Sequence, residues 1–407
     1  MSIKRTTSWL GAVSLVLAVG LPGLAQDLEG LQLFAPVEVT PYGCGPQPKE
    51  GYFFVWDGLN WSISKPNVAT VGFEGLTRTV YYGPHPIDEQ DPVSDAAIQS
   101  NSLDTGALRA FRTSGDRFEM GRVCGRHGWM VSTFHLKPQT QWIYASEVTM
   151  TFVDPEFGPL GSKLLEGIVG DDGEEPPVDI IRDLPLTFED VIIRNSVTTW
   201  SVELMYIHRS KQRHHGGFIE WFAGVRYMEF DENFNVDATG IPVVEAEPNE
   251  LGNILADSNW YTQADNHIVG PQAGLRWFRK RGRWMLSTEG RFFAGYNSQT
   301  IRQRGVLGSK LTPPGGLFEP AVMGPTYFTS VRHFDEWSPC AELRAELRFQ
   351  VTRSISLRAG WTGIWVDGIA RPSNMINYEV AYMGINGNGN RQDVFINGLT
   401  LGVDVNR

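Results

Sequence analysis

Alternation of apolar and charged residues is the feature that most constrains the fold of this chain. It is clearest over residues 341–349, where Ala, Leu, Ala, Leu and Phe take every second position and Glu, Arg, Glu and Arg lie between them. A period of two predicts a strand with one apolar and one polar face. The same pattern recurs at 199–208, 219–227, 269–277, 284–292 and 355–362. Short polar turns join these segments in pairs, which predicts antiparallel hairpins.

The length of the alternating segments indicates that their apolar faces contact a membrane and not water. Each runs for about nine to twelve residues, and about nine to eleven cross a bilayer when the strand is tilted. Aromatic residues gather toward the ends of the apolar faces, as in interfacial girdles. They are Trp200, Tyr206, Tyr227, Trp277, Trp284 and Phe349. The links 231–262 and 297–335 are long, whereas the turns inside hairpins are short, which is the outer-membrane barrel layout. A soluble sandwich or propeller is the alternative.

Further strands are predicted in the rest of the chain. They lie at 52–61, 118–125, 128–137, 142–153 and 399–405. No long helical period follows the N-terminal segment. The prediction is an all-β, antiparallel up-and-down transmembrane β-barrel of about 12 strands, with ten or fourteen as alternatives and with long external loops. Barrel closure favours an even number.

The N-terminus has the pattern of a secretory signal. Lys4 and Arg5 precede an apolar stretch, and small residues around Ala25 suit cleavage before Gln26. We therefore expect a signal peptide at 1–25, a Pro/Gly-rich segment at 26–50 and the barrel at 51–407. A net charge of −11 argues against nucleic acid as a partner, because phosphate binding needs a basic surface.

The polar faces of the predicted strands supply the candidate functional residues. In a barrel these faces point inward, so their charges would line the lumen. They are Glu203, Glu220, Arg226, Arg276, Glu289, Arg291, Glu342, Arg344, Glu346, Arg348 and Arg358. An open lumen with both signs of charge would pass small polar solutes passively. A closed lumen would hold the same charges as a salt-bridge ladder, and the barrel would then be structural or adhesive. We predict porin-like passive passage, with the structural or adhesive barrel as the alternative, because twelve strands lie between packed and water-filled barrels.

No catalytic, metal or cofactor site is predicted. The histidines have no partner at a recognisable spacing, and no Gly-x-Ser-x-Gly or His-Glu-x-x-His motif is present. An enzyme is therefore the weakest alternative. Cys44, Cys124 and Cys340 are an odd number, so they are either unpaired or form one pair. The expected partners are outer-membrane lipid, the barrel-assembly machinery and small polar solutes; the oligomeric state stays open.

Several motifs resemble a known family in their order along the chain. They are Trp200-x-x-Glu203, Gly224-Val225-Arg226-Tyr227-Met228 with Phe230-Asp231-Glu232, the segments 266–276, 290–297 and 339–349, and the closing run from Arg358-Ala359-Gly360-Trp361 to Arg371-Pro372 and Ile376-Asn377. Together they resemble the putative beta-barrel porin-7 family of planctomycete-type outer-membrane proteins, most specifically from about 197 to 378. The resemblance implies an outer-membrane barrel and no particular substrate or catalytic residue.

Overall fold

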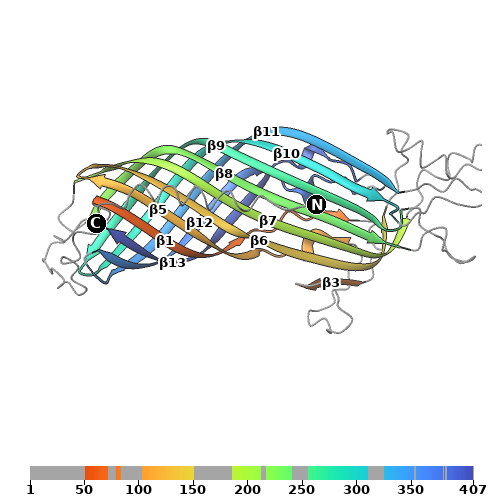
Figure 1. The fold of residues 1–407 in the computed structure, drawn as a ribbon, viewed down its shortest axis with the longest axis horizontal. Helices are drawn as coiled ribbons and strands as arrows, with labels where there is room; N and C mark the ends of the chain where they lie inside the picture. The colour runs from red at the N-terminus through yellow and green to blue at the C-terminus, as the bar shows by residue number, and fades with distance from the viewer. Residues whose placement is uncertain are drawn as a thin grey trace, which may run out of the picture.

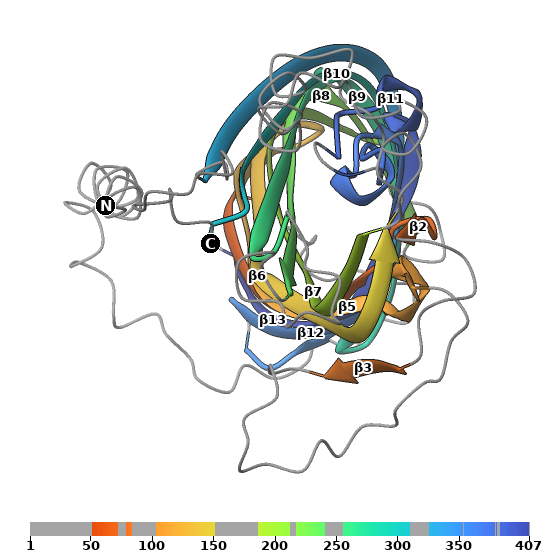
Figure 2. The same cartoon turned by 90° about the vertical axis from the view of Figure 1, so that its right-hand side faces the viewer.

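The chain forms a closed antiparallel β-barrel, drawn from the side in Figure 1 and after a quarter turn in Figure 2. The computed structural model describes residues 51–71, 79–83, 103–150, 186–211, 217–240, 255–309, 325–352, 354–378, 380 and 383–406. The expected signal peptide (1–25), the segment 26–50 and Cys44 lie outside these residues. No helix within the described ranges is long and apolar enough to cross a bilayer.

Ten strands make the barrel wall. They are β1 (Gly51–Ile63), β5 (Phe111–Cys124), β6 (His127–Met150), β7 (Leu186–Arg209), β8 (Gly217–Thr239), β9 (Ser258–Arg281), β10 (Trp284–Leu307), β11 (Thr326–Gln350), β12 (Ile355–Ile369) and β13 (Gln392–Asn406). Neighbours in the chain pair in sequence from β5 to β13, and β1 lies between β5 and β13 and closes the ring. Shorter elements are β2 (Thr70–Val71), β3 (Thr79–Gly83), β4 (Leu103–Asp104), and the 3₁₀ turns η2 (Thr105–Ala107), η4 (Pro372–Asn374) and η5 (Gly387–Gly389).

The all-β, up-and-down barrel is confirmed, but with ten strands in the wall instead of about twelve. Segments 128–137 and 142–153 were predicted as two strands, but 128–137 and 142–150 belong to the single strand β6, and 151–153 lie outside the described residues. The pairing of β6 with β7 shifts register between Leu136 and Gln139. Pro138 lies in this interval, and a proline has no N–H to donate to the ladder. The irregularity interrupts the alternation without ending the strand.

The strands are also longer than predicted, because the two faces exchange polarity along their length. In β8, the inward residues include Glu220 and Arg226 near the start of the strand but Phe230, Phe234 and Val236 further along. The outward residues change in the opposite sense, from Trp221 and Val225 to a run of Asp and Asn. The range 231–262, predicted as a link, therefore contains strand residues up to Thr239 and again from Ser258. The predicted link 297–335 likewise contains strand residues up to Leu307 and again from Thr326.

The two ends of the barrel differ. Phe53 pairs with Asn406, and the tight turns at Gly125 and Gly282 lie at the same end, which we call the short-turn end. Both glycines have φ near +60°, a conformation that other residues rarely adopt. The opposite, long-loop end carries the longer connections, including residues 240–257 and 308–325.

Exposed apolar side chains form a band around the half of the wall nearest the short-turn end. On β10 the outward face runs from Trp284 through Leu286 and Phe292 to Tyr296, all exposed. These twelve residue steps rise roughly 30 Å for a strand tilted by about 40°. That height matches the hydrocarbon core of a bilayer, about 30 Å. Beyond Tyr296 the outward residues become Ser, Thr and Arg.

The described cysteines do not pair. Cys124 is an exposed free thiol next to the β5–β6 turn, and Cys340 is a buried free thiol on β11. Because Cys44 lies outside the described residues, the choice between unpaired cysteines and one pair stays a prediction.

Candidate functional site in the barrel interior

The structure places all eleven candidate residues inside the barrel. Each of these eleven residues is at most 7 % exposed. They lie in the half of the interior that the apolar band surrounds. The period of two explains the placement, because the strand neighbours of most of these charges are apolar and point outward.

Five further charged residues, absent from the candidate set, also lie inside the barrel. They are Asp57, Arg117, Glu119, Arg209 and Asp404, each at most 5 % exposed. Arg117 and Glu119 alternate with the exposed Phe118 and Met120, so the same signal marks them. Arg209 follows the predicted strand segment 199–208, and in the structure it is the last residue of β7.

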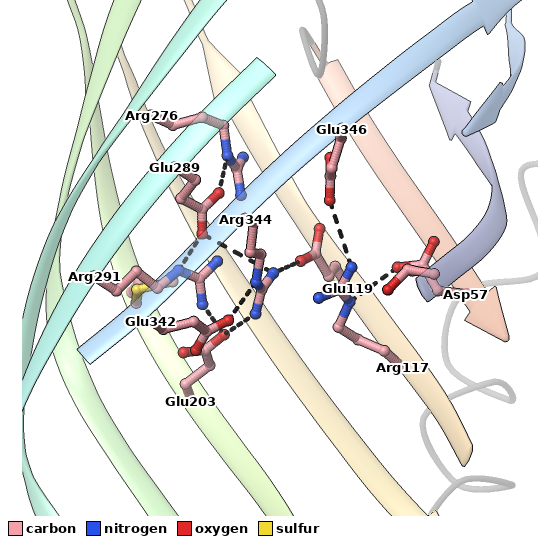
Figure 3. Close-up of polar contacts among 12 residues, drawn as sticks. Asp57, Arg117, Glu119, Glu203, Arg276, Glu289, Arg291, Glu342, Arg344 and Glu346 are labelled. Atoms are coloured by element: carbon pink, nitrogen blue, oxygen red, sulfur yellow. Dashed lines mark hydrogen bonds and ion pairs between the residues drawn. The ribbon is translucent and has the colours of Figure 1, made fainter. Parts of the chain in front are cut away.

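These sixteen residues form one connected network of ion pairs. It contains eight arginines and eight carboxylates, so its formal charge is zero. Arg344 lies near its centre, where Nη1 is 2.7 Å from Oε1 of Glu119 and the Nε donates to Glu342. Arg291 contacts both Glu203 and Glu289, and Figure 3 shows these groups turned toward one another. We call this set the ion-pair network.

A second part of the network joins the first and last strands of the wall. Arg117 Nε of β5 is 2.9 Å from Asp57 Oδ2 of β1, and Arg358 Nε of β12 is 3.1 Å from Asp57 Oδ1. Glu346 of β11 accepts from Arg117 and from Arg358. Arg348 Nη1 contacts Asp404 of β13 at 2.7 Å. The ion pairs therefore cross the lumen as well as linking neighbouring strands.

Aromatic rings occupy the remaining space beside the arginines. The guanidinium of Arg276 lies 4.8 Å from the centre of the Phe222 ring, and that of Arg209 lies 4.9 Å from Phe218. Arg226 lies 5.8 Å from Phe134 and from Phe293. A cation over an aromatic face is attracted by the ring, more strongly where water is excluded. Charges and rings together pack this half of the lumen.

The other half of the interior is filled by the chain between β12 and β13. This segment, residues 370–391, is the inner loop, and its buried residues include Met375, Ile376, Val380 and Met383. Ile376, Val380 and Met383 belong to an apolar cluster with inward residues of the long strands, such as Trp260. Met375 belongs to a second cluster with Ala264 and Ile301. Figure 2 shows the end of the chain after β12 folded inside the wall.

Buried polar contacts fix the inner loop to the wall. Arg371, fully buried, donates through Nε to Oε2 of Glu232 at 2.6 Å and through Nη1 to the carbonyl of Ser64 at 2.8 Å. Asn266 donates to the carbonyl of Ala370 and accepts from its N–H, at 2.9 and 2.8 Å. Gln303 donates to the carbonyl of Met383. No sequence pattern marked Arg371 or Glu232 as a pair, since they are far apart in the chain.

A group of ionisable residues lies on the outer wall beyond the apolar band. Asp231 of β8 is opposite Asp265 of β9, and Glu229 is opposite His267. Partial burial and then the negative charges of Glu229 and Asp265 raise the pKa of Asp231 to about 8, against the opposing effect of Arg302. A hydrogen bond to Glu229 also favours the protonated form of Asp231.

Asp231 is expected to make the stability of the barrel depend on pH. The unfolded chain loses this proton near pH 4 and the folded chain near pH 8, so the free energy of unfolding falls as pH rises through that window. Asp231→Asn removes this contribution and should stabilise the protein relative to wild type at pH 9 but not at pH 4. Thermal unfolding in detergent, followed by tryptophan fluorescence, measures the difference. The exposed Asp393, changed to Asn, is the control, and an equal shift in both variants would contradict the assignment.

No cluster of three or more His, Cys, Asp or Glu side chains within the described ranges could hold a metal ion. The interior is chemically a paired array of guanidinium and carboxylate groups.

Known proteins resemble the chain in sequence and in fold. A family model described as "Putative beta barrel porin-7" matches residues 191–406. No curated protein matches the sequence. Among solved structures, the outer membrane protease OmpT from Escherichia coli is similar at 7 % identity and a TM-score of 0.45, over 88 % of this chain and 97 % of that one. A FadL homologue from Pseudomonas aeruginosa is similar at 10 % identity and a TM-score of 0.27, over 92 % and 99 % of the two chains.

Proposed function

Because this chain belongs to the putative beta barrel porin-7 family, we propose that it is an outer-membrane β-barrel with a sealed lumen and a structural or adhesive role. One observation carries the proposal: the sixteen charges of the ion-pair network are buried against one another. A channel that conducts through a charged lumen keeps its charges in contact with water. Here the interior contains two successive seals, the ion-pair network and the inner loop.

The remaining parts of the proposal follow from this location. The signal peptide at 1–25 would direct export, and the barrel-assembly machinery would insert the strands. The exposed apolar band faces lipid, and the long-loop end faces the outside, as in other outer-membrane barrels. We propose no catalytic role, metal or cofactor.

Passive passage of small polar solutes is the second candidate function. The family description as a porin favours it. So do four guanidinium nitrogens that have no hydrogen-bond partner among the described residues, one each on Arg117, Arg291, Arg348 and Arg358. Buried polar atoms of this kind commonly bind water. In that case the eleven candidate residues would line the path.

Planar-bilayer recording separates the two functions. The purified barrel, shown to be folded by slower gel migration after boiling in SDS, is expected to give no steady conductance steps at high salt. Arg344 and Arg348, both replaced by Glu, provide the matched test of the second candidate. Steady steps in the wild-type protein, with an ion selectivity that this double replacement changes, would establish passage and contradict the sealed barrel.

A further inference from the structure

A groove crosses the outer wall where β1 and β13 meet. It has a volume of about 860 Å³ and is lined from β1, β5, β12 and β13. Its floor includes Gly58, where an added Cβ would meet only the carbonyl oxygen of Leu401, at 3.7 Å. Trp56 and Trp361 stand on its sides and are 44 % and 39 % exposed. The groove exists because a glycine lies between large side chains on an outward face.

The groove is apolar at one end and polar at the other. Leu401 and Val403 line the part toward the short-turn end. Asn60, Ser62 and Arg112 line the part toward the long-loop end, where β1 finishes and β5 begins. Ser62 pairs directly with Arg112 on one side and with Asn397 on the other. The polar end therefore lies at the edge of the band that faces the outer leaflet.

Arg112 differs from the arginines inside the barrel. Its residue is exposed, and within the described part of the chain its guanidinium makes no ion pair or hydrogen bond. Each of the eight arginines of the ion-pair network contacts at least one carboxylate. An arginine at the end of an apolar groove matches the shape and charge of a phosphate group that carries an acyl chain.

We propose that this groove binds one anionic phospholipid of the outer leaflet. An acyl chain lies over Gly58 between Trp56 and Trp361, and the phosphate contacts Arg112. Asn60, Ser62 and Asn397 supply hydrogen bonds to the head group. The inference depends on the membrane location of the barrel but not on whether its lumen is sealed.

Native mass spectrometry of the full chain in detergent tests the proposal, with phosphatidylglycerol and phosphatidylcholine of identical acyl chains as probes. Wild type should retain one phosphatidylglycerol in preference to phosphatidylcholine. Arg112→Gln should reduce that preference about fivefold, the effect of one arginine near an anionic head group. Gly58→Leu should fill the groove and abolish retention of both lipids.

Two control variants match these changes elsewhere on the outer wall. Arg304→Gln removes an exposed arginine of β10, and Gly290→Leu adds the same side chain at another open glycine. Both should retain lipid as wild type does. Equal retention of the two lipids by wild type, or an unchanged preference in Arg112→Gln, would overturn the proposal. So would a dimer in detergent that Gly58→Leu dissociates, because a second copy of the chain would then cover the groove.

Discussion

Replacing Arg344 with glutamine is expected to destabilise the folded barrel by about 3–5 kcal/mol, the usual cost of removing one partner from a buried ion pair. Arg344 contacts Glu342 and Glu119 directly and lies 3.9 and 4.0 Å from Glu203 and Glu289. Its loss leaves a surplus negative charge where little water is available to compensate it. Urea unfolding from detergent or vesicles, followed by tryptophan fluorescence, measures the change.

Arg302→Gln is the matched control for this experiment. Arg302 also contacts a carboxylate, Asp265, but its side chain is 52 % exposed, against 3 % for Arg344. Although the Asp265 side chain is only 10 % exposed, water reaches the Arg302 guanidinium, so this pair should contribute about 1 kcal/mol. The two variants should therefore differ by several kcal/mol. Similar small losses in both would mean that water reaches the ion-pair network, and the sealed lumen would be wrong.

Replacing Arg371 with methionine is expected to release the inner loop without unfolding the wall. The variant leaves the buried carboxylate of Glu232 with Asn195 as its remaining hydrogen-bond partner among the described residues. A local cost of about 3 kcal/mol corresponds to an opening of order 100-fold more frequent. Limited proteolysis should then cut within 370–391 faster by a similar factor, while the boiled and unboiled forms still differ in gel mobility.

The double replacement Arg371→Met with Glu232→Leu distinguishes charge from shape. Both side chains then suit the apolar surroundings, which include Phe230 at 5.8 Å from the guanidinium carbon. Exchanging a whole buried pair for apolar residues of similar volume is often neutral. Cleavage should return toward the wild-type rate. If the double variant is cut as fast as the single one, the ion pair is not what fixes the loop.

The sequence predicted which residues face inward, because a strand has only two faces and charges are costly against lipid. Glu220 and Arg226 could be placed from their apolar neighbours alone. The half of each strand nearer the long-loop end was not predicted, because the two faces exchange polarity there. Phe230 and Phe234 point inward and Asp231 and Asn233 point outward, whereas the prediction keeps the apolar residues on the outward face. The predicted number of strands was too high because the irregularity at Pro138 divides the alternating pattern of β6 in two. The pairing of charges across the lumen could not be predicted, because it depends on the barrel diameter and no local sequence pattern indicates that diameter.

The contact between β1 and β13 has a consequence for how the barrel is assembled. These strands lie at opposite ends of the described chain, yet Leu59 pairs with Thr400. The ion pair between Arg358 and Asp57, and that between Arg117 and Glu346, form only when this seam closes. An open sheet would expose unpaired charges to lipid. Closing the seam brings together segments that are distant in the chain, and this costs entropy before the new contacts compensate for it. Insertion and closure should therefore occur as a single slow, cooperative step, with no stable half-inserted sheet.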